Sequence, residues 1–206
     1  DVISVVGKSK FASFVSGGAG TDTISLSNFA DVIHIDGSDN ADSFAALDAT
    51  SSANRLDGVE VIEGLGGDDI IDLSSPFLAD LLNGFTVDAG SGADTVFGSS
   101  NNDIINGGAG SDTIAAGPGD NIISGGAGSD VFIFSKLTNS DTVTDIDPSK
   151  DSIRILTTGS EKPSRGTIET LETGYKWQFG TSELTFNVSE NLMIDSSEIL
   201  ISYTLI

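Results

Sequence analysis

Acidic and amide side chains recur at intervals of nine along the middle of the chain, each on a glycine-rich segment. The spaced positions are Asp94, Asp103, Asp112, Asn121 and Asp130. Carboxylate and amide oxygens are good ligands for hard divalent cations, and carboxylates stacked at strand spacing repel one another. A cation held between successive turns converts that repulsion into attraction. The spacing therefore predicts that ion binding and folding are one coupled event.

The elements that would position these side chains repeat with the same period. Five nine-residue units follow one another without a gap between Ala89 and Ile133: AGSGADTVF, GSSNNDIIN, GGAGSDTIA, AGPGDNIIS and GGAGSDVFI. Glycines permit a tight turn over the first six residues, and a short strand follows. Only the middle residue of that strand faces inward, because successive side chains alternate between faces. The expected inward residues are Val96, Ile105, Ile114, Ile123 and Phe132.

Two units complete one coil of eighteen residues, so turns eighteen residues apart become neighbours. We predict an all-β fold, a right-handed parallel β-roll of stacked nonapeptide repeats. The regular roll is expected over residues 89–135, and irregular coils over residues 1–88. Loops or short helices are expected at 41–57 and 74–84, where the period breaks. Residues 136–206 are expected to form an antiparallel β region that caps the open end.

The repeat resembles the repeats-in-toxin (RTX) family of proteins exported by bacterial type I secretion, which includes giant adhesins and modules of proteases and epimerases. In that family each ion takes the carbonyls of positions two and four and the aspartate of one turn. It also takes the carbonyls of positions one and three and the aspartate of the turn eighteen residues later. The resemblance implies several Ca²⁺ ions as cofactors, and ligation by many carbonyl oxygens suits calcium better than magnesium.

Carried over to this sequence, the family pattern assigns ligands to three sites in the regular roll. The first site would use Gly90, Gly92, Asp94, Gly107, Ala109 and Asp112. The second would use Gly108, Gly110, Asp112, Gly125, Ala127 and Asp130. The third would use Ser99, Asn101, Asp103, Ala116, Pro118 and Asn121. We expect the third site to be weaker because it lacks glycines and one carboxylate. Asp120 is a candidate to compensate in part for Asn121, but the register of the repeat would direct its side chain elsewhere.

Degraded copies of the repeat extend upstream, where Asp22 and Asp31 are again nine residues apart. A site is expected to join the turn that ends at Asp22 to the segment around Asp39. The turn at 64–69 supplies a further copy. The upstream candidate ligands are Gly18, Gly20, Asp22, Asp31, Gly37, Asp39 (with Asn40 as its alternative), Gly67 and Asp69.

Thirty-one acidic residues against nine basic ones give a formal net charge of -22. Such a surplus repels nucleic acid and anionic membrane surfaces. Apolar runs such as that at 199–201 are far too short to span a bilayer, so no membrane insertion is expected. The expected partners are calcium and the remainder of a larger polypeptide. The expected location is extracellular or at the cell surface.

Catalysis is not expected. His34 is the only histidine and cysteine is absent, so a nucleophilic site would have to be built around His34 alone. The sequence predicts a calcium-binding structural module of a secreted adhesin or surface-layer-like protein, which folds on export into calcium-rich medium. Two alternatives stay open. One is an accessory module of a type I-secreted hydrolase or lyase, and the other is a module whose sheet face or Trp177 binds a glycan, another cell-surface ligand or ice.

Overall fold

The computed structural model describes residues 2–4, 15–16, 20–34, 56–57, 59–74, 83–135, 140–147, 149–157, 167–171, 174–179, 182–187 and 201–205. Within these ranges the regular structure is all strand, as the repeat predicts, and no α-helix occurs. The described residues accordingly include no helix long and apolar enough to cross a membrane.

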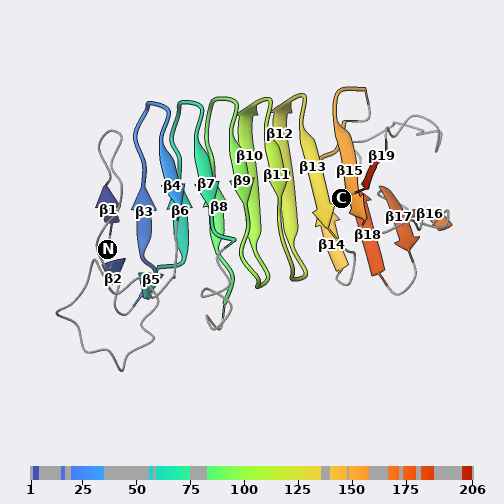
Figure 1. Ribbon diagram of the computed structural model, residues 1–206, viewed down its shortest axis with the longest axis horizontal. Coiled ribbons are helices and arrows are strands. Elements are labelled where there is room, and N and C mark those ends of the chain that lie inside the picture. The colour runs from blue at the N-terminus through green and yellow to red at the C-terminus, as the bar shows by residue number, and fades with distance from the viewer. Residues whose placement is uncertain are drawn as a thin grey trace.

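Most of the described strands belong to two sheets that run side by side along the molecule (Figure 1). The larger sheet contains, in spatial order, β1 (Val2–Ser4), β3 (Thr23–Ser25), β6 (Val61–Glu63), β8 (Thr86–Asp88), β10 (Ile104–Gly110), β12 (Ile122–Gly128), β14 (Ser140–Val143), β18 (Ser182–Asn187), β17 (Gly174–Phe179) and β16 (Thr167–Leu171). The smaller sheet contains β4 (Val32–His34), β7 (Ile70–Asp72), β9 (Thr95–Phe97), β11 (Thr113–Ala115), β13 (Val131–Ser135), β15 (Ser152–Thr157) and β19 (Ile201–Leu205). The short strands β2 (Val15–Ser16) and β5 (Leu56–Asp57) pair with each other.

The chain alternates between the two sheets, and strands of successive coils pair in parallel. In the larger sheet Ile105 pairs with Ile123, and in the smaller sheet Val96 pairs with Ile114. Each of these partners lies one coil of eighteen residues further along the chain, as two nine-residue units require. The parallel β-roll is therefore confirmed.

Upstream of the regular repeats the coils are longer, although the strands still stack in parallel. The backbone N–H of Asp69 reaches Asp94 across 25 residues, and that of Asp31 reaches Asp69 across 38. The additional residues fall after β4 and after β7. The loops or short helices expected at 41–57 and 74–84 lie largely outside the described residues.

The parallel stack continues beyond residue 135. β14 pairs in parallel with β12, β15 pairs in parallel with β13, and β18 and β19 then add to the two sheets. The expected antiparallel part is confirmed, but in the described chain it consists of β16, β17 and β18.

The core is a narrow column of apolar side chains that the two sheets share. The five inward residues expected from the repeat are each at most 1% exposed, which confirms the alternation of faces. Ile122 and Ile123 illustrate it on one strand, since Ile122 is 49% exposed and Ile123 is 1% exposed. The same inward position is occupied in the other described coils by Ile24, Ile33, Ile62, Ile71, Val87, Val143 and Ile153.

Two glycines in four of the five regular turns allow the coils to stack closely. Gly108 has φ +102° and Gly110 has φ +151°, a region that residues with a side chain rarely adopt. A Cβ atom on Gly108 would lie 2.0 Å from the carbonyl oxygen of Gly90, and one on Gly110 would lie 1.6 Å from that of Gly92. Only glycine fits both the conformation and the spacing.

Adjacent isoleucines on β12 provide a matched test of this core. Ile123→Ala should destabilise the calcium-saturated protein by about 2 to 5 kcal/mol, because it leaves a cavity between two sheets. Ile122→Ala removes the same atoms from the outer face and should cost less than about 1 kcal/mol. Urea unfolding of both variants measures the difference. Equal losses would contradict the assignment of faces.

Candidate metal centre

Aspartates gather along one edge of the roll, which is the upper edge in Figure 1. Each described turn that leads into β4, β7, β9, β11 or β13 ends in an aspartate, and we call these turns the aspartate edge. The aspartates are Asp31, Asp69, Asp94, Asp112 and Asp130, each at most 3% exposed. Buried carboxylates are uncommon unless a partner compensates for the loss of water.

In every one of these carboxylates except that of Asp31, one oxygen holds successive coils together. Oδ2 of Asp31 instead accepts the N–H and the hydroxyl of Ser27 in its own turn. The backbone N–H of Asp94 donates to Oδ1 of Asp112 at 2.8 Å, and that of Asp112 donates to Oδ1 of Asp130 at 2.9 Å. The same bond links Asp31 to Asp69, Asp69 to Asp94 and Asp130 to Asp151. The aspartates therefore form a continuous ladder.

The other oxygen of each carboxylate has no hydrogen-bond partner among the described residues. This is true of Oδ2 of Asp69, Asp94, Asp112 and Asp130, and of Oδ1 of Asp31. A buried polar atom without a partner costs about 1 to 3 kcal/mol, and a charged one costs more. A positively charged partner would stabilise this row of carboxylate oxygens, and the described part of the chain supplies none to them.

A backbone carbonyl faces the same point as the unpartnered oxygen. A Cβ atom on Gly107 would lie 2.7 Å from both Oδ2 of Asp112 and the carbonyl oxygen of Gly125 in the next turn. At Gly64 the corresponding atoms are Oδ2 of Asp69, at 2.9 Å, and the carbonyl oxygen of Ala89, at 2.0 Å. In these two turns, oxygens from two coils therefore lie in one small volume, an arrangement that suits a hard cation.

Carboxylates alone do not form this centre. Among the described residues, no group of three or more His, Cys, Asp or Glu side chains converges on one point. Two aspartates from neighbouring coils leave most of the ligand shell to backbone carbonyls. Such a donor set, all oxygen and with little charge, suits calcium and excludes the nitrogen and sulfur ligands that zinc prefers.

The structure brings the first two predicted ligand sets onto neighbouring turns. Gly108 pairs with Gly126 and Gly110 with Gly128, while Ser91 forms a bridge to Ala109. The carbonyl oxygen of Ala109 accepts the N–H of Gly92 at 2.8 Å. The carbonyl oxygen of Gly90 likewise accepts the N–H of Ala109 at 2.8 Å. Each carbonyl keeps a second lone pair for another partner.

The upstream pairing differs from the expectation. The backbone N–H of Asp22 donates to Oε2 of Glu60 at 2.9 Å, because β3 stacks on β6 rather than on a strand eighteen residues away. Glu60, which the repeat did not single out, is therefore the neighbour of Asp22. Gly18, Gly37, Asp39 and Asn40 lie outside the described residues. Gly20 precedes β3, and Gly67 lies in the turn that ends at Asp69.

The other edge places different residues at the same position of the turn. We call the turns that end at Phe85, Asp103 and Asn121 the opposite edge. The N–H of Asp103 donates to Oδ1 of Asn121 at 2.9 Å, so these turns stack as predicted. Asp120 does not compensate for Asn121: it is exposed, and its Oδ1 accepts the N–H of Ser140 at 2.8 Å.

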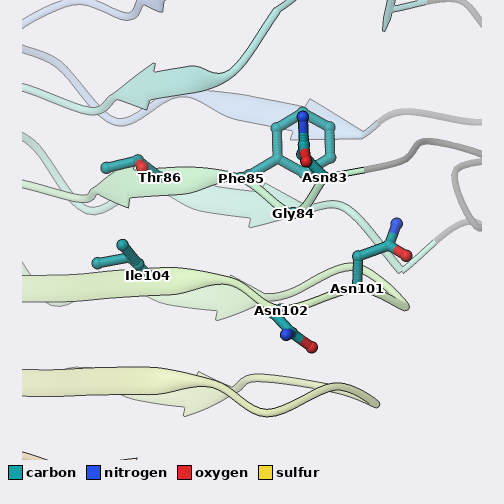
Figure 2. A pocket seen from close by; sticks show the side chains of 7 residues that line it. All are labelled: Asn83, Gly84, Phe85, Thr86, Asn101, Asn102 and Ile104. Atoms are coloured by element: carbon teal, nitrogen blue, oxygen red, sulfur yellow. The ribbon is translucent and has the colours of Figure 1, made fainter.

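Phe85 takes the place of an aspartate on this edge and is buried in the core. Beside it lies a pocket whose lining includes no carboxylate (Figure 2). The lining residues are Asn83, Gly84, Phe85, Thr86, Asn101, Asn102 and Ile104. The oxygen atoms of the residues that line this pocket are therefore neutral.

Two aspartates that the repeat did not single out close the C-terminal end of the aspartate edge. Asp145 accepts the N–H of Gly125 at 2.9 Å and that of Gly126 at 2.8 Å. Asp151 accepts the N–H groups of Asp130 and Asp147. The sequence carried a signal for Asp151, because an apolar Ile153 follows it at the spacing that Ile114 keeps from Asp112.

A family model matches this chain over five overlapping or neighbouring segments, which together cover slightly more than half of it. The model is that of the RTX calcium-binding nonapeptide repeat (4 copies), and it matches residues 10–33, 16–46, 55–75, 86–114 and 106–134. The chain belongs to this RTX family. RTX nonapeptide repeats are calcium-binding motifs, and stacked repeats bind several ions.

Solved structures provide two comparisons. A subunit of the mannuronan C5-epimerase from Azotobacter vinelandii is 19% identical, with a TM-score of 0.36, and the match covers 50% of this RTX chain and 78% of that subunit. The extracellular lipase from Serratia marcescens is 13% identical, with a TM-score of 0.35. That match covers 90% of this chain, which spans 40% of the lipase. No curated protein matches the chain significantly.

Burial raises the pKa of the ladder carboxyls. Desolvation, reinforced by neighbouring carboxylates, raises the pKa of Asp69 and of Asp130 to about 6, although the N–H bonds to them act in the opposite direction. Desolvation also raises the pKa of Asp94 and of Asp112. The folded roll without metal therefore holds protons more tightly than an unfolded chain, in which these groups titrate near 3.8.

Protonation of these carboxyls should therefore stabilise the roll in part when calcium is absent. The stability that protonation adds is fully present below about pH 4 and is lost as the pH rises through about 6. In calcium-depleted buffer, far-ultraviolet circular dichroism should show more β-structure at pH 5 than at pH 7. A β signal that is the same at both pH values, or weaker at pH 5, would contradict the raised pKa of the ladder carboxyls.

Proposed function

We propose that this RTX module folds by binding calcium along the aspartate edge. The supporting observation is the row of buried aspartate oxygens without hydrogen-bond partners, two of which, on Asp69 and Asp112, lie beside a carbonyl oxygen of the next coil. The regular turns would hold ions with the two ligand sets carried over from the family. Their shared carboxylate is that of Asp112. The turn that ends at Asp69 and the closing turn at Asp151 would extend the series at either end.

Calcium supplies the positive charge that brings two carboxylates and several carbonyls into one shell. Without it, the net charge of -22 opposes stacking of the turns. The low calcium concentration of a cytosol would keep the chain unfolded, whereas millimolar calcium outside the cell would fill weak sites. Folding then follows export, which suits the type I secretion that is typical of RTX proteins.

We further propose that the module belongs to a large secreted or cell-surface bacterial protein of the adhesin or surface-layer type and is not itself an enzyme. Sequence adjoining this chain in its gene distinguishes this parent from a secreted hydrolase or lyase. Tandem immunoglobulin-like repeats would support the adhesin, and a catalytic domain would overturn it.

Chelation is the direct test of calcium-dependent folding. Removing calcium at pH 7 should abolish most of the far-ultraviolet β signal, and added calcium should restore it. Magnesium at the same concentration should not restore the signal, because it keeps its waters and requires a tighter octahedral shell. A β signal that is indifferent to the chelator would overturn the proposed function.

Replacement of a shared ligand tests the location of the ions. Asp112→Asn should raise the calcium concentration at the folding midpoint at least roughly tenfold, since even outer-shell partners contribute about that much to metal affinity. Asp88→Asn is the matched control, because Asp88 is exposed on the outer face of β8 and the charge change is identical. Equal midpoints for the two variants would place the ions elsewhere.

A further inference from the structure

Asn121 occupies, on the opposite edge, the position that an aspartate holds on the aspartate edge. Its Oδ1 accepts the N–H of Asp103, the same bond that the ladder aspartates from Asp69 to Asp130 accept through Oδ1. That bond requires an acceptor, so the other side-chain atom is the Nδ2 donor. Asn121 therefore places an NH₂ group where Asp112 and Asp130 place an unpartnered oxygen.

The NH₂ group is surrounded by oxygens. Nδ2 donates to the carbonyl oxygens of Gly117 at 3.3 Å and Gly119 at 3.2 Å, and to Oδ1 of Asp141 at 2.8 Å. These are the second and fourth carbonyls of the turn and the carboxylate of the next coil. On the aspartate edge the same set of groups is assigned to an ion. Here the polypeptide satisfies them itself.

The preceding turn is also complete without an ion. Oδ2 of Asp103 accepts the N–H of Ser99 at 2.7 Å, and the hydroxyl of Ser99 lies 2.9 Å from Oδ1 and 3.1 Å from Oδ2. Oδ1 also accepts the N–H of Phe85 at 2.7 Å. Neither Asp103 nor Asn121 has a buried side-chain atom without a partner, whereas Asp94, Asp112 and Asp130 each have one.

We infer that the turns ending at Asp103 and Asn121 bind no calcium and are closed by hydrogen bonds. Ser99 satisfies Asp103 at the site assigned between these two turns. The amide nitrogen of Asn121 takes the place of an ion at the next position, between its own turn and Asp141. The family pattern assigned these turns a weak site, and the geometry disagrees with it. Calcium in the regular roll is then confined to the aspartate edge. The hydrogen bonds that stack the opposite edge include no ion, while folding of the roll as a whole still requires calcium on the aspartate edge. This inference rests on the proposed function.

Exchanging the side chains between the edges tests the inference. Asn121→Asp removes the donor from Gly117 and Gly119 and introduces a carboxylate beside Asp141. Counted by isothermal titration calorimetry or native mass spectrometry at pH 7, this variant should bind one more calcium ion per chain than the wild type. Its folding should also require more calcium. Asp112→Asn, the reciprocal change, should bind at least one ion fewer.

Asp103→Asn tests the wild-type turn directly and should leave the number of bound ions unchanged. If that variant does not fold at saturating calcium, Asn121→Ala replaces it with the same expectation. Loss of an ion in either variant would overturn the inference. So would an unchanged ion count in Asn121→Asp, or failure of that variant to fold at saturating calcium. An unchanged count in Asp112→Asn would instead overturn the proposed function, so the two failures are distinguishable.

Discussion

The interaction on which the roll depends is the buried aspartate at the end of each turn of the aspartate edge. One oxygen of Asp112 accepts an amide proton from the preceding coil and so fixes the spacing of the stack. The other is buried without a partner. Under the proposed function, a small cation that meets this oxygen stabilises the turn at neutral pH. Glycines and short strands are what permit the oxygens to be placed so close together.

Both edges link closely stacked coils, but the side chains that complete their turns differ. Both link successive coils through an amide proton that is donated to a side-chain oxygen. On the aspartate edge, the second oxygen of the carboxylate has no partner in the described chain, and the proposed partner is calcium from the medium. The opposite edge uses Ser99 and the amide of Asn121, which belong to the chain itself. In this proposal, calcium stabilises the turns of the aspartate edge, whereas hydrogen bonds within the chain stabilise those of the opposite edge.

The narrow core explains why the turns matter so much. A three-residue strand of the regular coils contributes one fully buried side chain, such as Ile114 or Val96, and its neighbouring residues face outward. A column of this width buries little apolar surface for the backbone that it orders. The ends need closure as well, and Asp145 supplies it by accepting two amide protons of the last glycine turn.

The sequence by itself determined what depends on local spacing. The period of nine was sufficient to predict the parallel roll, the inward residues and the alignment of Asp94, Asp112 and Asp130, because turn and strand geometry act within a few residues. The tertiary structure alone decided which coils become neighbours across insertions, and it paired Asp31 with Asp69 and Asp22 with Glu60. It also decided the chemistry of each edge. An asparagine and an aspartate look alike in a repeat, and they differ only in whether a donor reaches oxygens that other coils provide.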